Sequence, residues 1–242
     1  MKKGKKDYIY SILDRFYLRL LTTRYFFSPK EALYHPVELN DKPFNAKREK
    51  GSHERLEVIL SIIGDTPSSI LDIGSAEGYF SMNLAKKGNF VVAIEGKKQR
   101  AMIGQILARN NNLNKVSFYN LNLDVDSANA LPEFDNVLCL AVWHHWVRIK
   151  DLDYANKLLA VIWSKTKKRM FFETGLEELP EHFKLKGNDE EWLLDNLSST
   201  LLESKVVEIS ESTSFAAEEF MSSKVKSESS SFKRKLYLIE RI

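Results

Sequence analysis

A glycine-bearing turn between a predicted strand and a predicted helix is the part of this sequence best suited to binding a ligand. The apolar run at 69–73 meets Gly74 and Gly78, and a helical apolar pattern follows. These elements make a nucleotide-binding corner, because glycine lets a ligand approach the backbone closely. Ala76 and Tyr79 stand where a dinucleotide fingerprint has its second and third glycines, so the turn does not predict a dinucleotide.

An acidic residue follows at the distance that a nucleotide-binding α/β unit requires. Residues 90–95 read as a second buried strand that ends in Glu95, about 20 residues beyond the glycine turn. A carboxylate at this place accepts hydrogen bonds from both hydroxyls of a ribose. Glu95 is therefore predicted to bind the sugar of a nucleotide.

The pattern Asp72-x-Gly74-x-x-x-Gly78 resembles motif I of the class I S-adenosylmethionine (SAM) methyltransferases, and the resemblance covers residues 55–175. It implies SAM as the cofactor, with Glu95 at the ribose and Asp124 at the adenine amino group. The cofactor-binding residues that it implies are Asp72, Gly74, Ser75, Gly78, Glu95, Gly96, Asp124 and Leu140. A different nucleotide, a degenerate site and a non-catalytic SAM-binding subunit are the alternatives.

Two adjacent histidines, His144 and His145, follow the predicted fourth strand. Ligands of doubly wound sheets lie outside the carboxyl ends of the strands, so this loop should border the transferred methyl group. An imidazole there can take the proton of a hydroxyl acceptor, orient the substrate, or cap the adenine side of the pocket. No metal site is predicted, because adjacent histidines on an extended segment point apart and no carboxylate or cysteine cluster adds ligands.

Three further residues are predicted to contact the substrate. Glu173 ends the predicted fifth strand, where it can bind substrate, pair with a histidine or cap the following segment. Arg48 and Arg55 precede motif I, and the planar fork of arginine suits a phosphate or the SAM carboxylate. Surface arginines on a helix are the alternative for both.

The arginines and the histidine pair together are similar in outline to two groups of methyltransferases that cap a terminal phosphate. One group caps bacterial O-antigen chains, and the other forms the methylphosphate cap of small RNAs. The resemblance implies an oxygen acceptor on a cell-surface glycan or on its phosphate. An RNA or other nucleic-acid methyltransferase is the rival reading, although no Asn-Pro-Pro-Tyr-type motif follows the fourth strand.

Composition and charge fit one α/β domain with an addition. The chain has 242 residues, 43% of them hydrophobic, and a net charge of +3. Residues 1–50 carry 12 Lys and Arg against 6 Asp and Glu, so the basic character belongs to this region. No apolar run reaches the ~20 residues of a membrane span, and we expect a cytoplasmic protein. The single cysteine, Cys139, excludes an intrachain disulfide.

The N-terminal region, 1–50, is predicted to be a basic helical extension with a linker at 28–50. Apolar residues recur on one helical face between Tyr8 and Leu21. We expect this face to pack on the domain, and peripheral contact with a membrane is the alternative.

The methyltransferase domain is assigned to residues 51–242. Its pattern predicts helices near 52–63, 78–87, 97–111, 151–164 and 189–203, and strands near 69–73, 90–95, 116–121, 136–141, 169–173, 205–210 and 234–241. Alternating strands and helices give a Rossmann-like, doubly wound α/β fold. The resemblance adds a seven-stranded, mostly parallel sheet with an antiparallel edge hairpin.

Overall fold

The computed structural model describes residues 13, 16, 34–39, 42–44, 49–179, 189–215 and 231–242. The helices are α2 (Glu49–Ile63), α3 (Tyr79–Lys86), α4 (Lys98–Asn110), α5 (Val125–Asn129), α6 (Trp143–Ile149), α7 (Leu152–Ser164), η2 (Leu176–Glu178) and α8 (Asp189–Thr200). The strands are β1 (Val37–Leu39), β2 (Lys42–Phe44), β3 (Ser69–Ile73), β4 (Phe90–Glu95), β5 (Val116–Asn120), β6 (Phe134–Leu140), β7 (Thr166–Glu173), β8 (Ser204–Phe215) and β9 (Ser231–Arg241).

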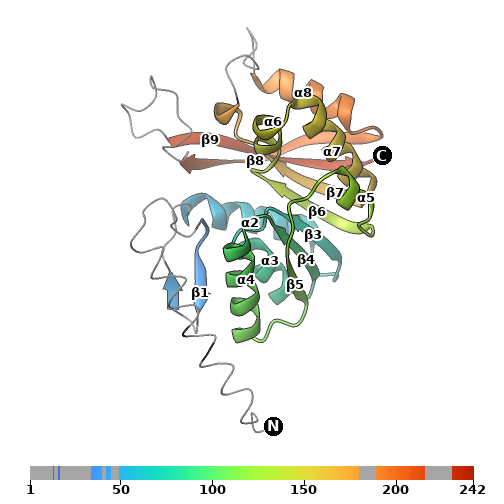
Figure 1. Cartoon of the computed structure of the whole chain (residues 1–242). Helices are drawn as coiled ribbons and strands as arrows, with labels where there is room; N and C mark the ends of the chain where they lie inside the picture. Colours follow the sequence, from blue (N-terminus) through green and yellow to red (C-terminus); the bar gives the residue numbers. More distant parts are fainter. Residues whose placement is uncertain are drawn as a thin grey trace.

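Seven of the strands form one sheet in the order β5-β4-β3-β6-β7-β9-β8 (Figure 1). The first five strands run parallel, and β9 runs antiparallel to both β7 and β8. The predicted α/β sheet with an edge hairpin is confirmed. The strand order reverses between β3 and β6, which is where a doubly wound sheet opens a crevice for a ligand.

The sheet is covered on both faces, and each face has its own apolar core (Figure 1). On β3, Ile70 faces the core formed with α2, α3 and α4, whereas Leu71 faces the core formed with α6, α7 and α8. Successive strand residues alternate between faces, so an almost continuous apolar strand is the expected sequence of a sheet buried on both sides.

Two predictions about irregular segments are wrong. The predicted linker contains the short antiparallel pair β1–β2, whose Val37 is buried in the core formed with α2, α3 and α4. The loop after the fourth strand is the short helix α6 rather than an extended segment. In the first case three prolines obscured a hairpin, and in the second the helix is too short for periodicity to show.

The predicted N-terminal helix lies outside the described residues except for Leu13 and Phe16, which are helical. Their exposed fractions are 54% and 62%, and packing of the helix on the domain stays a prediction. Within the described part of the chain, no helix is long and apolar enough to cross a membrane.

Candidate active site

The motif I turn follows β3 and is hydrogen-bonded to the carboxyl end of the neighbouring strand β4. The backbone N–H groups of Gly74 and Ser75 both donate to the carbonyl of Ile94, at 2.8 and 3.1 Å. Gly78 has a φ of +91°, and a Cβ on it would lie 2.3 Å from the ring of Phe118. Only glycine meets both demands, so the pattern read from the sequence reflects real steric limits.

Glu95 lies at the end of β4 and binds the same turn. Its carboxylate accepts hydrogen bonds from the backbone N–H of Ala76 at 2.9 Å and of Lys97 at 2.7 Å. Each oxygen of a carboxylate has two lone pairs, so both oxygens can still accept from a ribose. The structure thus brings the predicted acid and the glycine turn together. Ribose binding by Glu95 stays a prediction.

Asp72 is buried beneath the turn, and its Oδ2 accepts a hydrogen bond of 2.5 Å from the Ser81 hydroxyl. Burial, together with the nearby charge of Glu95 and against the hydrogen bond from Ser81, raises the pKa of Asp72 to about 6. The carboxyl group therefore anchors helix α3 to the turn. Its burial disfavours the ionised form.

Two buried oxygens on the turn are suited to a polar ligand. Ser75 Oγ and Glu77 Oε1 have no hydrogen-bond partner among the described residues. Burial raises the pKa of Glu77, although Arg100, 3.4 Å from Oε1, opposes this shift. The amino-acid end of SAM carries an ammonium group with three N–H donors, so these oxygens fit the predicted cofactor. Glu77 was missed from the sequence although it lies inside motif I.

Residues 34–37 run beside this turn. The Tyr34 N–H donates to Glu77 Oε2 at 3.2 Å, and His35 Nδ1 lies 2.8 Å from Ser52 Oγ. The ring of His35 stacks on Tyr79 at the start of α3. This segment therefore fixes the turn to helix α2.

The remaining predicted cofactor residues lie along the same edge of the sheet. Asp124 is exposed and caps α5, since its Oδ1 accepts from the Ser127 backbone N–H at 2.8 Å. That hydrogen bond, with the one from the Ser127 hydroxyl, lowers the pKa of Asp124. A Cβ on Gly96 would lie 2.3 Å from Asn122 Oδ1. Leu140 is half-buried at the end of β6.

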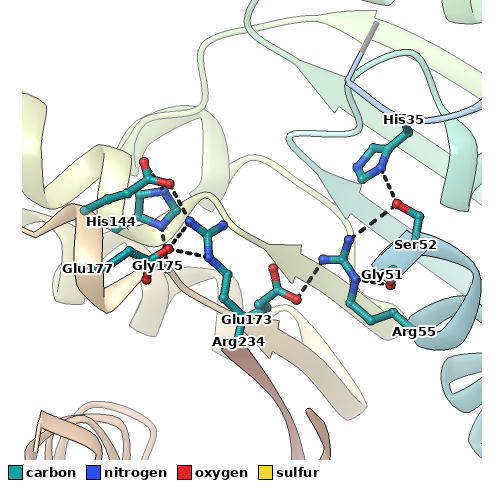
Figure 2. A network of polar contacts seen from close by, with 10 residues as sticks. His35, Gly51, Ser52, Arg55, His144, Glu173, Gly175, Glu177 and Arg234 are labelled. Carbon is teal, nitrogen blue, oxygen red and sulfur yellow. Dashed lines mark hydrogen bonds and ion pairs between the residues drawn. The ribbon is translucent and has the colours of Figure 1, made fainter. Parts of the chain in front are cut away.

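His144 is buried at the start of α6 and both of its ring nitrogens are engaged (Figure 2). Nδ1 accepts from the Gly175 backbone N–H at 3.1 Å and lies 3.2 Å from Thr174 Oγ1. Nδ1 therefore has no proton, and Nε2–H faces Glu178 Oε2 at 3.3 Å. Burial lowers the pKa of His144 against the pull of Glu178, so the ring is a neutral structural group.

His145 is half-buried, with its ring centre 4.3 Å from that of His144. Burial lowers the pKa of His145 to about 3, and the neighbouring His144 adds to this effect. An imidazole with so low a pKa is neutral at physiological pH but a weak proton acceptor. The two histidines, predicted as equivalent candidates, thus have different environments.

The grounds for predicting no metal site are wrong, because α6 brings both histidines together and Glu178 adds a carboxylate. One ligand atom from each of the three residues lies within 4.8 Å of the others. The protonation of His144 nevertheless disfavours a metal at Nε2, since Nδ1 already accepts from Gly175 and the ring would have to lose its last proton. This donor set suits a hydrogen-bond network better than a metal ion.

Arg55 and Glu173 form a buried ion pair between α2 and the end of β7 (Figure 2). Arg55 Nη1 donates to Glu173 Oε2 at 2.7 Å, and Arg55 Nε donates to the Gly51 carbonyl at 2.8 Å. The side chains are 2% and 0% exposed, so Arg55 is not a surface arginine. Glu173 pairs with Arg55 and not with a histidine. The second predicted arginine, Arg48, lies outside the described residues.

A buried arginine that the sequence reading missed, Arg234, completes the cluster from strand β9. Its Nε donates to Glu177 Oε1 at 2.8 Å, and its Nη2 contacts both Glu177 and Glu178. A Cβ on Gly175 would lie 2.6 Å from Nη2, so this glycine leaves room for the guanidinium group. Burial lowers the pKa of Arg234, but the carboxylates of Glu177, Glu173 and Glu178 outweigh it and raise the pKa.

Strand alternation does not mark Arg234, because on β9 Leu236 and Leu238, which share its parity, and Tyr237 and Ile239, which do not, are all buried. Glu178 is also buried and contacts Arg148 at 3.5 Å. Burial raises the pKa of Glu178, but His144 and Arg234 outweigh burial and lower it. No sequence pattern marks Glu178, since it lies in the short helix η2.

Comparison with known proteins gives two sequence relatives of different kinds. No protein-family model matches the chain. The O-antigen chain terminator bifunctional methyltransferase/kinase WbdD of Escherichia coli is 29% identical over 145 residues, which are 57% of this chain and 20% of WbdD. The 23S rRNA (uracil(1939)-C(5))-methyltransferase RlmD of Aliivibrio fischeri (strain MJ11) is 31% identical over 106 residues, which are 42% of this chain and 24% of RlmD. The chain thus matches about a fifth to a quarter of these relatives' length.

Solved structures show the same fold over more of the chain. The crystal structure of WbdD covers 92% of this chain and 46% of its own, with a TM-score of 0.64 and 23% identity. Magnesium protoporphyrin IX methyltransferase (ChlM) from Synechocystis PCC 6803 with bound SAM covers 78% of this chain, with a TM-score of 0.54 and 14% identity. This chain is thus similar in fold to WbdD and ChlM, and over parts of its length it is similar in sequence to the methyltransferases WbdD and RlmD.

Proposed function

We propose that this protein methylates an oxygen of a terminal phosphate on a cell-surface glycan. The observation that carries the proposal is the cluster at the carboxyl ends of β6 and β7. Three guanidinium groups, of Arg55, Arg148 and Arg234, gather there beside a histidine whose two nitrogens are both engaged. Arginine suits a phosphate acceptor, which needs no base to become nucleophilic.

The resemblance to WbdD supports the same acceptor class, because WbdD is described as an O-antigen chain terminator with methyltransferase and kinase activities. A hydroxyl acceptor loses a proton during methyl transfer, and a suitable base raises the rate by about 10²–10⁴-fold. Neither His144, whose nitrogens are engaged, nor His145, with its low pKa, is well suited to that role.

In the proposed reaction, SAM bound at the glycine turn supplies an electrophilic methyl group. The turn and Glu95 hold the cofactor side of the crevice. The Arg55–Glu173 and Arg234 groups hold the acceptor oxygen in line with the carbon–sulfur bond. The chain contributes chiefly by positioning both reactants beside these buried side chains.

The test uses SAM labelled in its methyl group and glycan fractions prepared with and without prior phosphatase treatment. We expect label only in the untreated fraction, since phosphatase removes the acceptor. The labelled product should then resist phosphatase, because methylation converts a phosphate monoester into a diester.

Three other results would replace this proposal. Equal labelling of both fractions would indicate a hydroxyl acceptor. Label confined to an RNA fraction would indicate the rival nucleic-acid methyltransferase. Binding of S-adenosylhomocysteine without transfer to any fraction would indicate a non-catalytic SAM-binding subunit.

A further inference from the structure

Two buried atoms at the end of the sheet have no hydrogen-bond partner among the described residues: Glu173 Oε1 and Arg234 Nη1. Their residues are 0% and 2% exposed. The rest of each side chain is fixed, because Glu173 Oε2 accepts from Arg55 and the other nitrogens of Arg234 bind Glu177 and Glu178. Buried polar atoms are normally paired, so an unpaired acceptor and an unpaired donor in one cluster call for a ligand.

The two side chains lie on the same side of neighbouring strands. Glu173 of β7 is opposite Leu236 of β9, and Arg234 is two residues from Leu236 on the same face. Diagonal neighbours of this kind are close enough for long side chains to reach the same ligand. In Figure 2, Glu173 lies between the guanidinium groups of Arg55 and Arg234.

The chemistry of this pair favours a group that both donates and accepts hydrogen bonds. Glu173 Oε1 accepts only, and Arg234 Nη1 donates only. The charged side chains of the cluster balance, since Arg55, Arg148 and Arg234 face the carboxylates Glu173, Glu177 and Glu178. A balanced cluster has no excess positive charge for a fully ionised dianion, and it suits a singly charged hydrogen phosphate.

We propose that Glu173 and Arg234 recognise the hydrogen-phosphate end of the acceptor, with the P–OH group donating to Glu173 and a phosphate oxygen accepting from Arg234. Arg55 holds Glu173 in place for this contact. The inference rests on the proposed function and deepens it, because it names the ionic form of the phosphate that is bound and a residue, Arg234, that selects it.

Inorganic phosphate and sulfate make a matched pair of probes, since they share shape but only phosphate can donate a hydrogen bond near neutral pH. Both are titrated by calorimetry into the full chain saturated with S-adenosylhomocysteine at pH 6. We expect phosphate to bind at least about tenfold more tightly than sulfate, because sulfate leaves Glu173 unpaired and facing a like charge.

The variants test each residue separately. Glu173→Gln replaces the acceptor with an amide that can donate, and should abolish or reverse the preference for phosphate. Arg234→Lys keeps the positive charge but loses the planar, two-pronged guanidinium group, and should weaken the binding of both ions by about tenfold. The control is Lys233→Gln on the same strand, an exposed residue paired with Glu211, which should change neither affinity.

Equal affinity for the two ions in the wild type, or a phosphate preference unchanged by both variants, would overturn the proposal. Glu173 Oε1 and Arg234 Nη1 would then be assigned to hydrogen bonds with a bound water. S-adenosylhomocysteine binding reports folding in every variant. If Glu173→Gln does not fold, the phosphate and sulfate affinities of Arg234→Lys and of the wild type still test the proposal. Absence of methyl transfer to phosphate-ended glycans, with the ion preference intact, would count against the proposed function alone.

Discussion

At the scale of single residues, Glu95 shows how one side chain can serve both the fold and the ligand. Its two oxygens already accept backbone hydrogen bonds from Ala76 and Lys97. Its role at the ribose was predicted from its place at the end of β4. Its contacts with the turn were not predicted, because a motif gives spacing and not the pairing of individual lone pairs.

Glu95→Ala should weaken the binding of S-adenosylhomocysteine by about 1–3 kcal/mol, because the turn and the ribose both lose an acceptor. Glu95→Gln should also weaken it, since the amide sets an N–H group against a backbone N–H. Calorimetry with SAM, S-adenosylhomocysteine and NAD checks this prediction, and we expect no binding of NAD. An unchanged affinity in Glu95→Ala would refute the assigned role.

Asp72→Asn should stabilise the protein above pH 6. The folded-state pKa of Asp72 is raised to about 6, so the folded state binds more protons than the unfolded state and stability falls as pH rises from about 4 to 6. Asp72→Asn removes the buried charge, so it should raise the free energy of unfolding by about 1–3 kcal/mol at pH 8 and change it little at pH 4. Thermal melts at both pH values measure the difference, and equal shifts at the two would contradict it.

At the scale of elements, helix α6 places the two adjacent histidines close together but in different environments, with His144 buried and His145 half-buried. The helix begins just after Ala141, which has a φ of +56°. This left-handed residue turns the chain sharply out of β6 and allows His144 to reach Gly175. Such a turn at a residue other than glycine leaves no mark in the sequence, which is why an extended loop was predicted.

The pH dependence of methyl transfer should reflect the ionisation of the acceptor phosphate and not that of the histidines of α6. We expect kcat/KM to fall as the acceptor phosphate loses its second proton near pH 6, because the site proposed above binds the hydrogen-phosphate form, and the midpoint should be the same in His145→Ala. The low pKa of His145, about 3, places its titration well below this range. A midpoint that disappears in His145→Ala, with a rate loss of about 10²–10⁴-fold, would instead identify a general base.

At the scale of the whole molecule, the alternation of strands and helices was predictable because buried parallel strands leave continuous apolar runs between helical patterns. The acceptor side was predicted only in part. Glu173 and Arg55 were found as separate candidates, but their ion pair joins residues 118 positions apart. Arg234 was hidden because charged residues flank it on an edge hairpin, where one buried cation resembles the exposed Lys233 and the half-buried Lys235 beside it.

The segment at 34–37 should contribute to stability more than the exposed Leu13. Val37→Ala should lower stability by about 1–2 kcal/mol, since Val37 is buried in the core formed with α2, α3 and α4. Leu13→Ser should leave the melting temperature almost unchanged, because this side chain is 54% exposed. Thermal melts of both variants test this, and a loss in Leu13→Ser as large as that in Val37→Ala would contradict it.

The position of Arg234 on β9 also has a consequence for the order in which the protein acquires its parts during synthesis. The glycine turn and Glu95 are 19 residues apart, so the cofactor side can form while the chain is still being made. Arg234 reaches Glu178 from 56 residues further along, after most of the domain has left the ribosome. A nascent or proteolytically clipped chain that lacks β9 would therefore have its cofactor-side turn but leave Glu177 and Glu178 without their arginine. The buried cluster at Glu177 and Glu178, where we propose that the acceptor binds, is therefore completed only when β9 is in place.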